Sequence, residues 1–324
     1  MKKIIFGIGD KNFAKDVASQ LDLNLAHHTE FYFDDKEPYI RSDVNVRGCD
    51  AYVVSSLYSD SQDSICEKLC KLLFFIGSLK DASAERVTLI APYLGFSRQD
   101  RKVISREPIT TKYVAKMFES VGVDHLLTID VHSLGAFQNA YRCRVDNLEC
   151  KNLLAEYMSK KLADISADDV SVLSPDSGGL GRTRRFRDKL SALMRGEVKI
   201  AFYDKMRKGK EIIGSNIIGD VAPTTIVVDD MISSGGTIIK TLEPLKKRGA
   251  KRIYVVATHG LFVGDANENL LNPDIHQIIV SDTIEPFRLS ETIAKKTEIV
   301  STTGLIAEAI ERIYTGESLS SMFN

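Results

Sequence analysis

The chain has 324 residues, of which 44% are hydrophobic, and its 43 basic and 44 acidic residues give a formal net charge of -1. This composition predicts a globular protein of two medium-sized domains and gives no general electrostatic basis for binding nucleic acid or a membrane. No stretch approaches the ~20 apolar residues of a membrane span, and the opening MKKIIFGIGD is too short for a signal peptide. The five cysteines form no C-x-x-C pair, so we expect reduced thiols in a cytoplasmic protein.

In chain order, the first half alternates short apolar strands with amphipathic helices. Strands are predicted at residues 4–8, 51–55, 87–90 and 126–129. One helical face contains Ile65, Leu69, Leu72, Leu73 and Ile76, with Asp63 or Ser61 as the expected N-cap. A second helix opens after Pro108, and its expected core face contains Val114, Met117, Phe118 and Val121.

Polar residues between and after these strands are candidate ligand contacts. An acidic turn with Phe33, Asp35 and Glu37 reads, taken alone, as a solvated hairpin. Arg98 and Gln99 follow the strand at 87–90, and His132 follows the strand at 126–129. Ligands of open α/β sheets gather at the carboxyl ends of strands, which favours a binding role. A solvated cationic loop and a structural histidine remain the alternatives.

The second half opens with a helix near residues 153–162 and a strand at 170–173, which ends in a Ser-Pro-Asp-Ser-Gly-Gly turn containing Asp176. Asp176 is either a helix cap or a ligand. The helix that follows should bury Phe186, Leu190 and Leu193, and we assign no catalytic role to its arginines. Residues 204–219, with Lys205 and Arg207, indicate a mobile cationic loop or, alternatively, a polar hairpin.

Residues 224–237, TTIVVDDMISSGGT, carry the most chemistry. A buried β-branched strand delivers Asp229 and Asp230 to a Ser/Gly loop at the start of a helix. Backbone N–H groups and hydroxyls of residues 233–237 would face outward at the helix N-terminus, where a phosphate is favoured. The two carboxylates would repel that phosphate but accept hydrogen bonds from vicinal hydroxyls. The pattern predicts a sugar-phosphate site, with an ordinary strand-to-helix connection as the alternative.

The complete string closely resembles the ribose-phosphate binding motif of the type I phosphoribosyltransferase fold. Residues 248–252, RGAKR, and 257–259, ATH, match one branch of it, the ribose-phosphate pyrophosphokinase family. The resemblance runs from about Phe33 to the C-terminus. It implies an α/β protein of two tandem phosphoribosyltransferase-like domains, each a mostly parallel sheet flanked by helices. Residues 1–148 would form the ATP side with subunit contacts, and residues 149–324 would carry the ribose 5-phosphate site and the catalytic loop.

The resemblance also implies the roles of individual residues. Phe33 would stack on adenine, with Asp35, Glu37, Arg98 and Gln99 as further ATP contacts. His132 and Asp176 would lie at Mg²⁺, and Lys205 and Arg207 would be catalytic. Ribose 5-phosphate would be held by Asp229, Asp230, Ser233, Ser234, Gly235, Gly236 and Thr237. The implied reaction converts ATP and ribose 5-phosphate to phosphoribosyl pyrophosphate and AMP, in a homo-oligomer built as a dimer or hexamer.

The chain departs from the family pattern at Ser233, where many members carry Asp. Phosphate binding should survive, because it needs N–H groups and hydroxyls rather than an acid. Pro244 removes one backbone hydrogen bond in the next helix and predicts a kink there. Two rival functions are a phosphoribosyltransferase and a non-catalytic partner of a synthetase; the ATP-side residues oppose the first, and the retained catalytic residues oppose the second.

Overall fold

The structure, a computed structural model, describes residues 1–9, 11–208 and 211–322, including the side chains of all these except residues 205–215. It divides into two compact units. Unit 1 is Met1–Glu149 together with the segment from Thr302 onward, and unit 2 is Cys150–Ser301. The sequence assigned everything after residue 148 to the second domain. The C-terminal segment differs from that expectation because its helix packs against the first helix of the chain.

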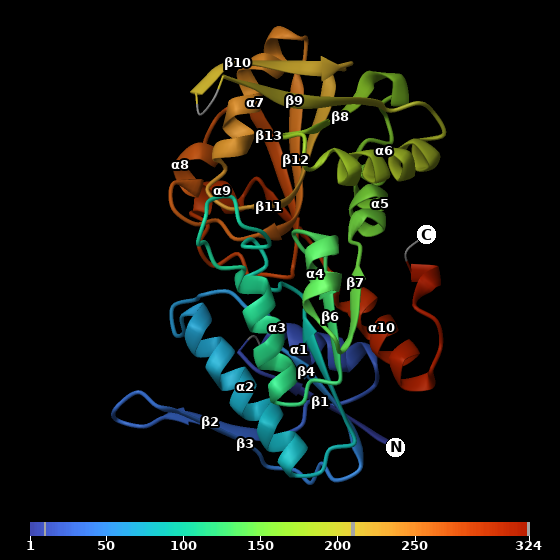
Figure 1. The fold of residues 1–324 in the computed structure, drawn as a ribbon. Coiled ribbons are helices and arrows are strands. Elements are labelled where there is room, and N and C mark those ends of the chain that lie inside the picture. The colour runs from blue at the N-terminus through green and yellow to red at the C-terminus, as the bar shows by residue number, and fades with distance from the viewer. Residues whose placement is uncertain (10, 209–210, 323–324) are drawn as a thin grey trace. The chain divides into compact units, whose positions relative to one another are not determined.

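Unit 1 is built on a five-stranded sheet in the order β1-β4-β5-β6-β7, in which every neighbouring pair is parallel. Strands β2 and β3 form a separate antiparallel hairpin (Figure 1). The elements are β1 (Lys2–Gly7), α1 (Lys11–Gln20), β2 (His28–Tyr32), β3 (Pro38–Ser42), β4 (Cys49–Val54), α2 (Ile65–Asp81), β5 (Arg86–Ala91), α3 (Thr110–Ser120), β6 (His125–Ile129), α4 (Leu134–Ala140), β7 (Arg144–Leu148), α10 (Thr303–Thr315) and the short 3₁₀ helix η2 (Ser320–Met322).

The sheet of unit 1 is buried on both faces, as parallel sheets generally are. Alternate strand residues such as Phe6, Val53 and Leu89 pack in one apolar cluster with Phe75 of α2 and Phe118 of α3. The intervening residues are also buried and point to the opposite face; they include Ile5, Tyr52, Ile90 and Leu127. The near-continuous apolar strands of the sequence follow from this two-sided burial.

Unit 2 contains a seven-stranded sheet in the order β10-β9-β8-β11-β12-β13-β14. All neighbouring pairs are parallel except β9 and β10, which form an antiparallel hairpin. The elements are α5 (Lys151–Lys161), the 3₁₀ helix η1 (Ala167–Asp169), β8 (Val170–Ser174), α6 (Leu180–Met194), β9 (Lys199–Lys208), β10 (Glu211–Gly219), β11 (Thr224–Ile232), α7 (Gly236–Lys247), β12 (Arg252–Gly260), α8 (Ala266–Leu270), β13 (Ile275–Ser281), α9 (Glu291–Ala294) and β14 (Thr297–Val300).

The mixed α/β architecture predicted from the sequence is confirmed, and three local predictions are wrong. Ser64 caps α2, since its hydroxyl accepts from the Glu67 N–H in a capping box, so neither Ser61 nor Asp63 is the cap. Met117 and Leu193, expected in the core, are 44% and 38% exposed. Both lie at the margin of an apolar helix face, where spacing alone does not separate core from rim.

Residues 204–208 and 211–219 belong to an antiparallel β-hairpin, so the structure agrees with the polar hairpin that the sequence allowed rather than with a mobile cationic loop. Backbone pairing of β9 with β10 runs from Ala201 opposite Gly219 to Lys208 opposite Glu211, with a register shift between Ile212 and Gly214. Helix α7 continues through Pro244 to Lys247, so the predicted kink stays a prediction. Within residues 1–9, 11–208 and 211–322, none of the helices is long and apolar enough to cross a membrane.

Glu30 on β2 lies in a strongly cationic environment. The His28 imidazole, whose Nε2 lies 3.7 Å from Glu30 Oε1, is the largest of the effects that lower the pKa of Glu30 to about 2. Lys11 and Lys71, at 3.0 Å and 3.8 Å from the carboxylate, act in the same direction, while burial opposes them. A depressed carboxylate pKa stabilises the fold above the unfolded pKa, and this contribution is lost as pH falls through the folded value.

We therefore expect Glu30→Gln to lower the free energy of unfolding near neutral pH by about 1–2 kcal/mol, allowing for solvent screening. The deficit should shrink as the pH falls through about 2, because below that value the wild-type carboxyl is protonated in both states. Urea titrations across that range measure it. Glu37→Gln, on an exposed carboxylate of the same hairpin, is the matched control. A deficit independent of pH would contradict the charge explanation.

Candidate active site

The carboxyl end of β11 carries the acidic pair at the centre of the site. Its strand is buried between β8 and β12, so Asp229 and Asp230 leave a rigid, apolar element. Their side chains are 18% and 6% exposed. Burial first, and then the neighbouring Asp230 carboxylate, raise the pKa of Asp229 well above its usual range. The Asp230 N–H donates to Asp229 Oδ1 at 2.8 Å and partly offsets this.

Arg182, in the first turn of α6, supplies the positive charge next to this pair. Its Nη1 lies 3.9 Å from Asp229 Oδ1 and its Nη2 lies 3.7 Å from Asp230 Oδ2. These separations exceed hydrogen-bond length, so the guanidinium neutralises the carboxylates without being locked to them. The sequence analysis gave this arginine no role. The sequence feature that could have identified it is its position just after the Asp176 turn, which follows β8, the strand that pairs with β11.

The turn between β11 and α7 has the geometry expected of an anion site. Gly235, the N-cap of α7, has φ +76°, a conformation that favours glycine. A Cβ there would also lie 3.4 Å from Asn269 and Leu270. Ser233, Ser234, Gly236 and Thr237 are partly exposed, so their N–H groups and hydroxyls are accessible at the N-terminus of the twelve-residue α7.

The carbonyl oxygens of this turn accept hydrogen bonds from the segment that follows β12. Ile232 O accepts from the Leu261 and Phe262 N–H groups at 3.0 Å, and Ser233 O accepts from the Val263 N–H at 3.0 Å. Asn269 Nδ2 donates to Ser234 O at 2.8 Å. With its carbonyl oxygens bonded to the segment after β12, the turn has a fixed orientation. No sequence pattern identified Asn269, which lies 35 residues from its partner.

The second turn, between β8 and α6, is tight and polar. Asp176 Oδ1 accepts from the Gly179 N–H at 2.9 Å, and Ser174 Oγ donates to Asp176 O at 2.7 Å. A Cβ at Gly179 would lie 2.8 Å from Ser174 Oγ, 3.7 Å from Asp176 Oδ1 and 3.9 Å from Arg182 Nη1. Asp176 and Arg182 therefore border the same small space. The N-cap of α6 is Gly179 rather than Asp176, whose partly exposed carboxylate accepts from the Gly179 N–H, and a ligand role for Asp176 stays a prediction.

In unit 1, the predicted nucleotide contacts lie on two separate features. Phe33, Asp35 and Glu37 occupy the exposed tip of the β2–β3 hairpin. The Phe33 ring is 49% exposed, and it packs edge-on against Phe31 and Tyr39 with centroids 5.2 Å and 6.0 Å away. An aromatic face thus remains accessible at the hairpin tip.

The other unit 1 residues follow β5 and β6, which are parallel neighbours. Arg98 and Gln99 are exposed, and the Gln99 side chain accepts a hydrogen bond from the Thr110 hydroxyl. His132 is exposed after Asp130, whose φ is +41°, and Asn147 holds the intervening Val131 N–H at 2.7 Å. The structure places these residues at the same edge of one sheet, as strand ends predict.

The predicted catalytic pair lies on the β9–β10 hairpin. Lys205 pairs with Ser215 and Arg207 with Ile212 along the backbone, while their side chains lie outside the described residues. Among the described residues, no group of three or more His, Cys, Asp or Glu side chains could hold a metal ion. Asp176 and His132 are thus single candidate ligands.

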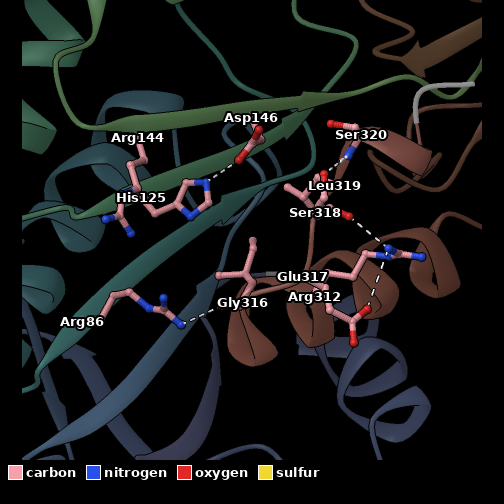
Figure 2. Close-up of a pocket in the computed structure, with 11 residues that line it drawn as sticks. Arg86, His125, Arg144, Asp146, Arg312, Gly316, Glu317, Ser318, Leu319 and Ser320 are labelled. Carbon is pink, nitrogen blue, oxygen red and sulfur yellow. Dashed lines mark hydrogen bonds and ion pairs between the residues drawn. The ribbon is translucent and has the colours of Figure 1, made fainter.

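A pocket of about 410 Å³ lies elsewhere in unit 1, between the strands β5, β6 and β7 and the segment after α10 (Figure 2). Three of its basic side chains, His125, Arg86 and Arg312, have acidic partners. His125 Nε2 lies 2.7 Å from Asp146 Oδ2, Arg86 pairs with the buried Asp50, and Arg312 Nη2 lies 2.8 Å from Glu308. None of the residues predicted from the sequence as site residues lines it.

These features define an α/β protein with an acidic pair beside an anion-binding turn. The model of the N-terminal domain of ribose phosphate pyrophosphokinase matches residues 2–122, and that of the phosphoribosyl synthetase-associated domain matches residues 192–324. The ribose-phosphate pyrophosphokinase of Vibrio vulnificus is 38% identical over 325 residues, covering 99% of both chains. That of Buchnera aphidicola is 39% identical over 324 residues, covering 99% of this chain and 98% of its own.

A solved structure agrees with these relatives. The phosphoribosylpyrophosphate synthetase of Mycobacterium smegmatis superposes with a TM-score of 0.87 at 30% identity, covering 98% of this chain and 100% of its own. The chain belongs to the ribose-phosphate pyrophosphokinase family, and it is an enzyme of that family, a transferase of nucleotide biosynthesis. The family resemblance inferred from the sequence is confirmed.

Because the pKa of Asp229 is raised, its charge destabilises the fold at any pH above the unfolded value. We expect Asp229→Asn to raise the free energy of unfolding near neutral pH by about 1–2 kcal/mol in metal-free buffer, with the gain vanishing towards about pH 3. Denaturant titrations at both ends of this range measure it. The control is Asp188→Asn, on a 60% exposed carboxylate of α6, which should change little. A lower free energy of unfolding for Asp229→Asn than for wild type near neutral pH would contradict this explanation.

Proposed function

We propose that the protein transfers the β,γ-diphosphoryl group of Mg-ATP to the anomeric hydroxyl of ribose 5-phosphate, giving 5-phosphoribosyl 1-pyrophosphate and AMP. The observation that carries this proposal is the β11–α7 turn, whose carbonyls are held from behind beside two carboxylates. A phosphate group binds the N–H groups of such a turn, and the ribose hydroxyls on the far side of the sugar ring would then donate to Asp229 and Asp230. A bond forms between the anomeric oxygen and the β-phosphorus, and the bond from that phosphorus to the AMP oxygen breaks.

On the sugar side, the N–H groups and hydroxyls of residues 233–237 would hold the 5-phosphate. Asp229 and Asp230 would accept hydrogen bonds from the ribose hydroxyls. Neutral hydroxyl donors suit this buried pair better than a further anion would, because burial and the neighbouring Asp230 carboxylate already raise the pKa of Asp229. Arg182, close to both carboxylates and to the Asp176 turn, would contact the diphosphoryl group as it arrives.

On the nucleotide side, Phe33 would stack on adenine, with Asp35 and Glu37 beside it. Arg98 and Gln99 would contact the remainder of ATP, since an arginine fork matches phosphate oxygens. An exposed aromatic ring and an exposed arginine are compatible with these roles. Positioning and charge neutralisation, rather than a covalent protein nucleophile, supply most of the catalysis in such transfers.

Lys205 and Arg207 would stabilise the charge that develops as AMP departs. Mg²⁺, when bound, would neutralise the ATP phosphate oxygens. The partly exposed Asp176 carboxylate fits the preference of Mg²⁺ for oxygen ligands from carboxylates, phosphates and water. The His132 imidazole is a softer ligand than a carboxylate, so we place it beside the metal–nucleotide complex rather than among the direct ligands of Mg²⁺. We further propose a cytoplasmic homo-oligomer, a dimer or hexamer.

The experiment measures AMP release from Mg-ATP with and without ribose 5-phosphate. AMP should form only with the sugar phosphate, and Lys205→Ala should lower kcat by on the order of 10²–10³-fold, because it removes a charge from the transition state. Lys199→Ala, at the exposed start of the same strand, is the matched control and should stay within about twofold of wild type.

Two outcomes would contradict the proposal. If folded wild-type protein releases no AMP, the result would indicate a non-catalytic partner of a synthetase. Consumption of phosphoribosyl pyrophosphate with a nucleobase, without any need for ATP, would indicate a phosphoribosyltransferase.

The held turn gives a second prediction. Asn269→Ala should raise KM for ribose 5-phosphate about tenfold and leave KM for ATP within about twofold, because only the Ser234 carbonyl loses its partner. Asn267→Ala is a close control on the same helix, since that side chain instead contacts the Arg288 carbonyl and the Ser290 N–H at 2.9 Å and 2.8 Å. Initial rates at varied sugar phosphate decide it; equal effects from both variants would show that helix α8 matters only for folding.

A further inference from the structure

Two lysines of α2 are buried in unit 1, and one of them, Lys71, contacts strand β2 of the β2–β3 hairpin. Lys68 and Lys71 are only 4% and 6% exposed, which is rare for lysine unless its charge is paired. They face a set of acidic and aromatic side chains drawn from β2 and from the segment before α2. We call the set the lysine cluster; its members are Glu30, Tyr32, Tyr58, Asp60, Asp63, Lys68 and Lys71.

Lys71 is the member that joins the hairpin to the helix. Its Nζ lies 2.5 Å from Asp63 Oδ2 and 3.8 Å from Glu30 Oε2. It also lies 5.1 Å from the centre of the Tyr32 ring, and the Tyr32 hydroxyl donates to Asp63. Glu30 and Tyr32 are on β2, so a single buried cation holds two residues of that strand and the residue just before α2.

Lys68 contacts the segment that precedes α2. It pairs with Asp60 and lies 4.1 Å from the centre of the Tyr58 ring. Asp60 Oδ1 in turn accepts from the Gln62 and Asp63 N–H groups at 2.8 Å each. The position of Asp63, and through it of Tyr32, is thus set by backbone hydrogen bonds as well as by Lys71.

The same segment also borders the strand end that carries Arg98 and Gln99. The Leu57 N–H donates to Tyr93 O at 2.9 Å, and the Tyr93 N–H donates to Ser56 Oγ at 3.2 Å. A Cβ at Gly95 would lie 2.5 Å from Leu57 O, so the two backbones are in close contact. Residues 56–63 therefore connect both features that carry the proposed nucleotide contacts.

We infer that Lys71 is a positioning residue for the nucleotide, acting through Asp63 and Tyr32 to hold the β2–β3 hairpin against α2. The hairpin extends beside α2, away from the five-stranded sheet, and its tip bears Phe33, Asp35 and Glu37 (Figure 1). A hairpin of two short strands is marginal alone and needs packing from elsewhere to keep one orientation. The inference rests on the proposed function, because it uses the assignment of the tip to ATP.

The test compares Lys71→Met with wild type. Methionine keeps most of the length of the side chain but removes the charge, leaving Asp63 and Glu30 without their shared partner. We expect KM for ATP to rise about tenfold, KM for ribose 5-phosphate to stay within about twofold, and amide hydrogen exchange across residues 30–40 to accelerate. A general loss of folding would not separate the two substrates in this way.

Two further variants keep the test decisive. Tyr32→Phe removes only the hydroxyl that donates to Asp63, so it should fold and show the same effect on ATP in smaller measure. Lys80→Met removes another cation of α2, one that contacts Asp124 at 3.0 Å, far along the helix from the hairpin contacts, and should leave both KM values unchanged.

The inference is overturned if folded Lys71→Met and Tyr32→Phe keep the wild-type KM for ATP, or if both KM values rise together. If Lys71→Met does not fold, Tyr32→Phe alone decides between these results. Failure of the proposed function is a separate result, since wild type itself would then form no AMP from ribose 5-phosphate. In that case amide hydrogen exchange across residues 30–40 still reports whether Lys71 holds the hairpin against α2. Unchanged exchange in both variants would refute that role of Lys71.

Discussion

The candidate site depends on where the carbonyl oxygens of one turn are bonded. A turn can present its N–H groups to an anion only if its carbonyls are satisfied elsewhere, since each peptide carries both. Here Ile232, Ser233 and Ser234 direct theirs to Leu261, Phe262, Val263 and Asn269. The parallel pairing of β11 with β12 makes this possible, because it brings the segment after β12 behind the turn.

The two units handle buried charge in different ways. Around Asp229 and Asp230 the charges are poorly matched, with one arginine at 3.7–3.9 Å, so the acid pair is strained and ready to accept donors from a ligand. The lysine cluster is closely paired, with Lys71 at 2.5 Å from Asp63 and the pKa of Glu30 lowered. Incompletely paired charges suit a binding site, because a ligand can supply the missing partner, whereas closely paired charges suit a contact that joins two elements. Binding sites commonly lower the stability of a fold in this way.

Much of the fold, and the turns that form the candidate site, could be predicted from the sequence, because the signals are local. An apolar β-branched run, two acids and a Ser/Gly turn lie within the short stretch from Thr224 to Thr237, and the Asp176 turn repeats the pattern. Arg182 was missed because it is one of several arginines on α6, and only the position of α6 beside β11 distinguishes it. Asn269 and Lys71 could not be found either, since their partners are distant in sequence or belong to another element. The sequence of residues 204–219 left a mobile loop and a polar hairpin as alternatives, and only the backbone pairing of β9 with β10 decides for the hairpin.

The most direct measurement follows the β-phosphorus of ATP. With ATP radiolabelled at that position, Mg²⁺ and ribose 5-phosphate, the account predicts that the label moves to the sugar product and that the AMP formed carries none. Label recovered in ADP, or label that stays in the nucleotide when ribose 5-phosphate is present, would contradict the transfer of a diphosphoryl group and with it the role assigned to the β11–α7 turn.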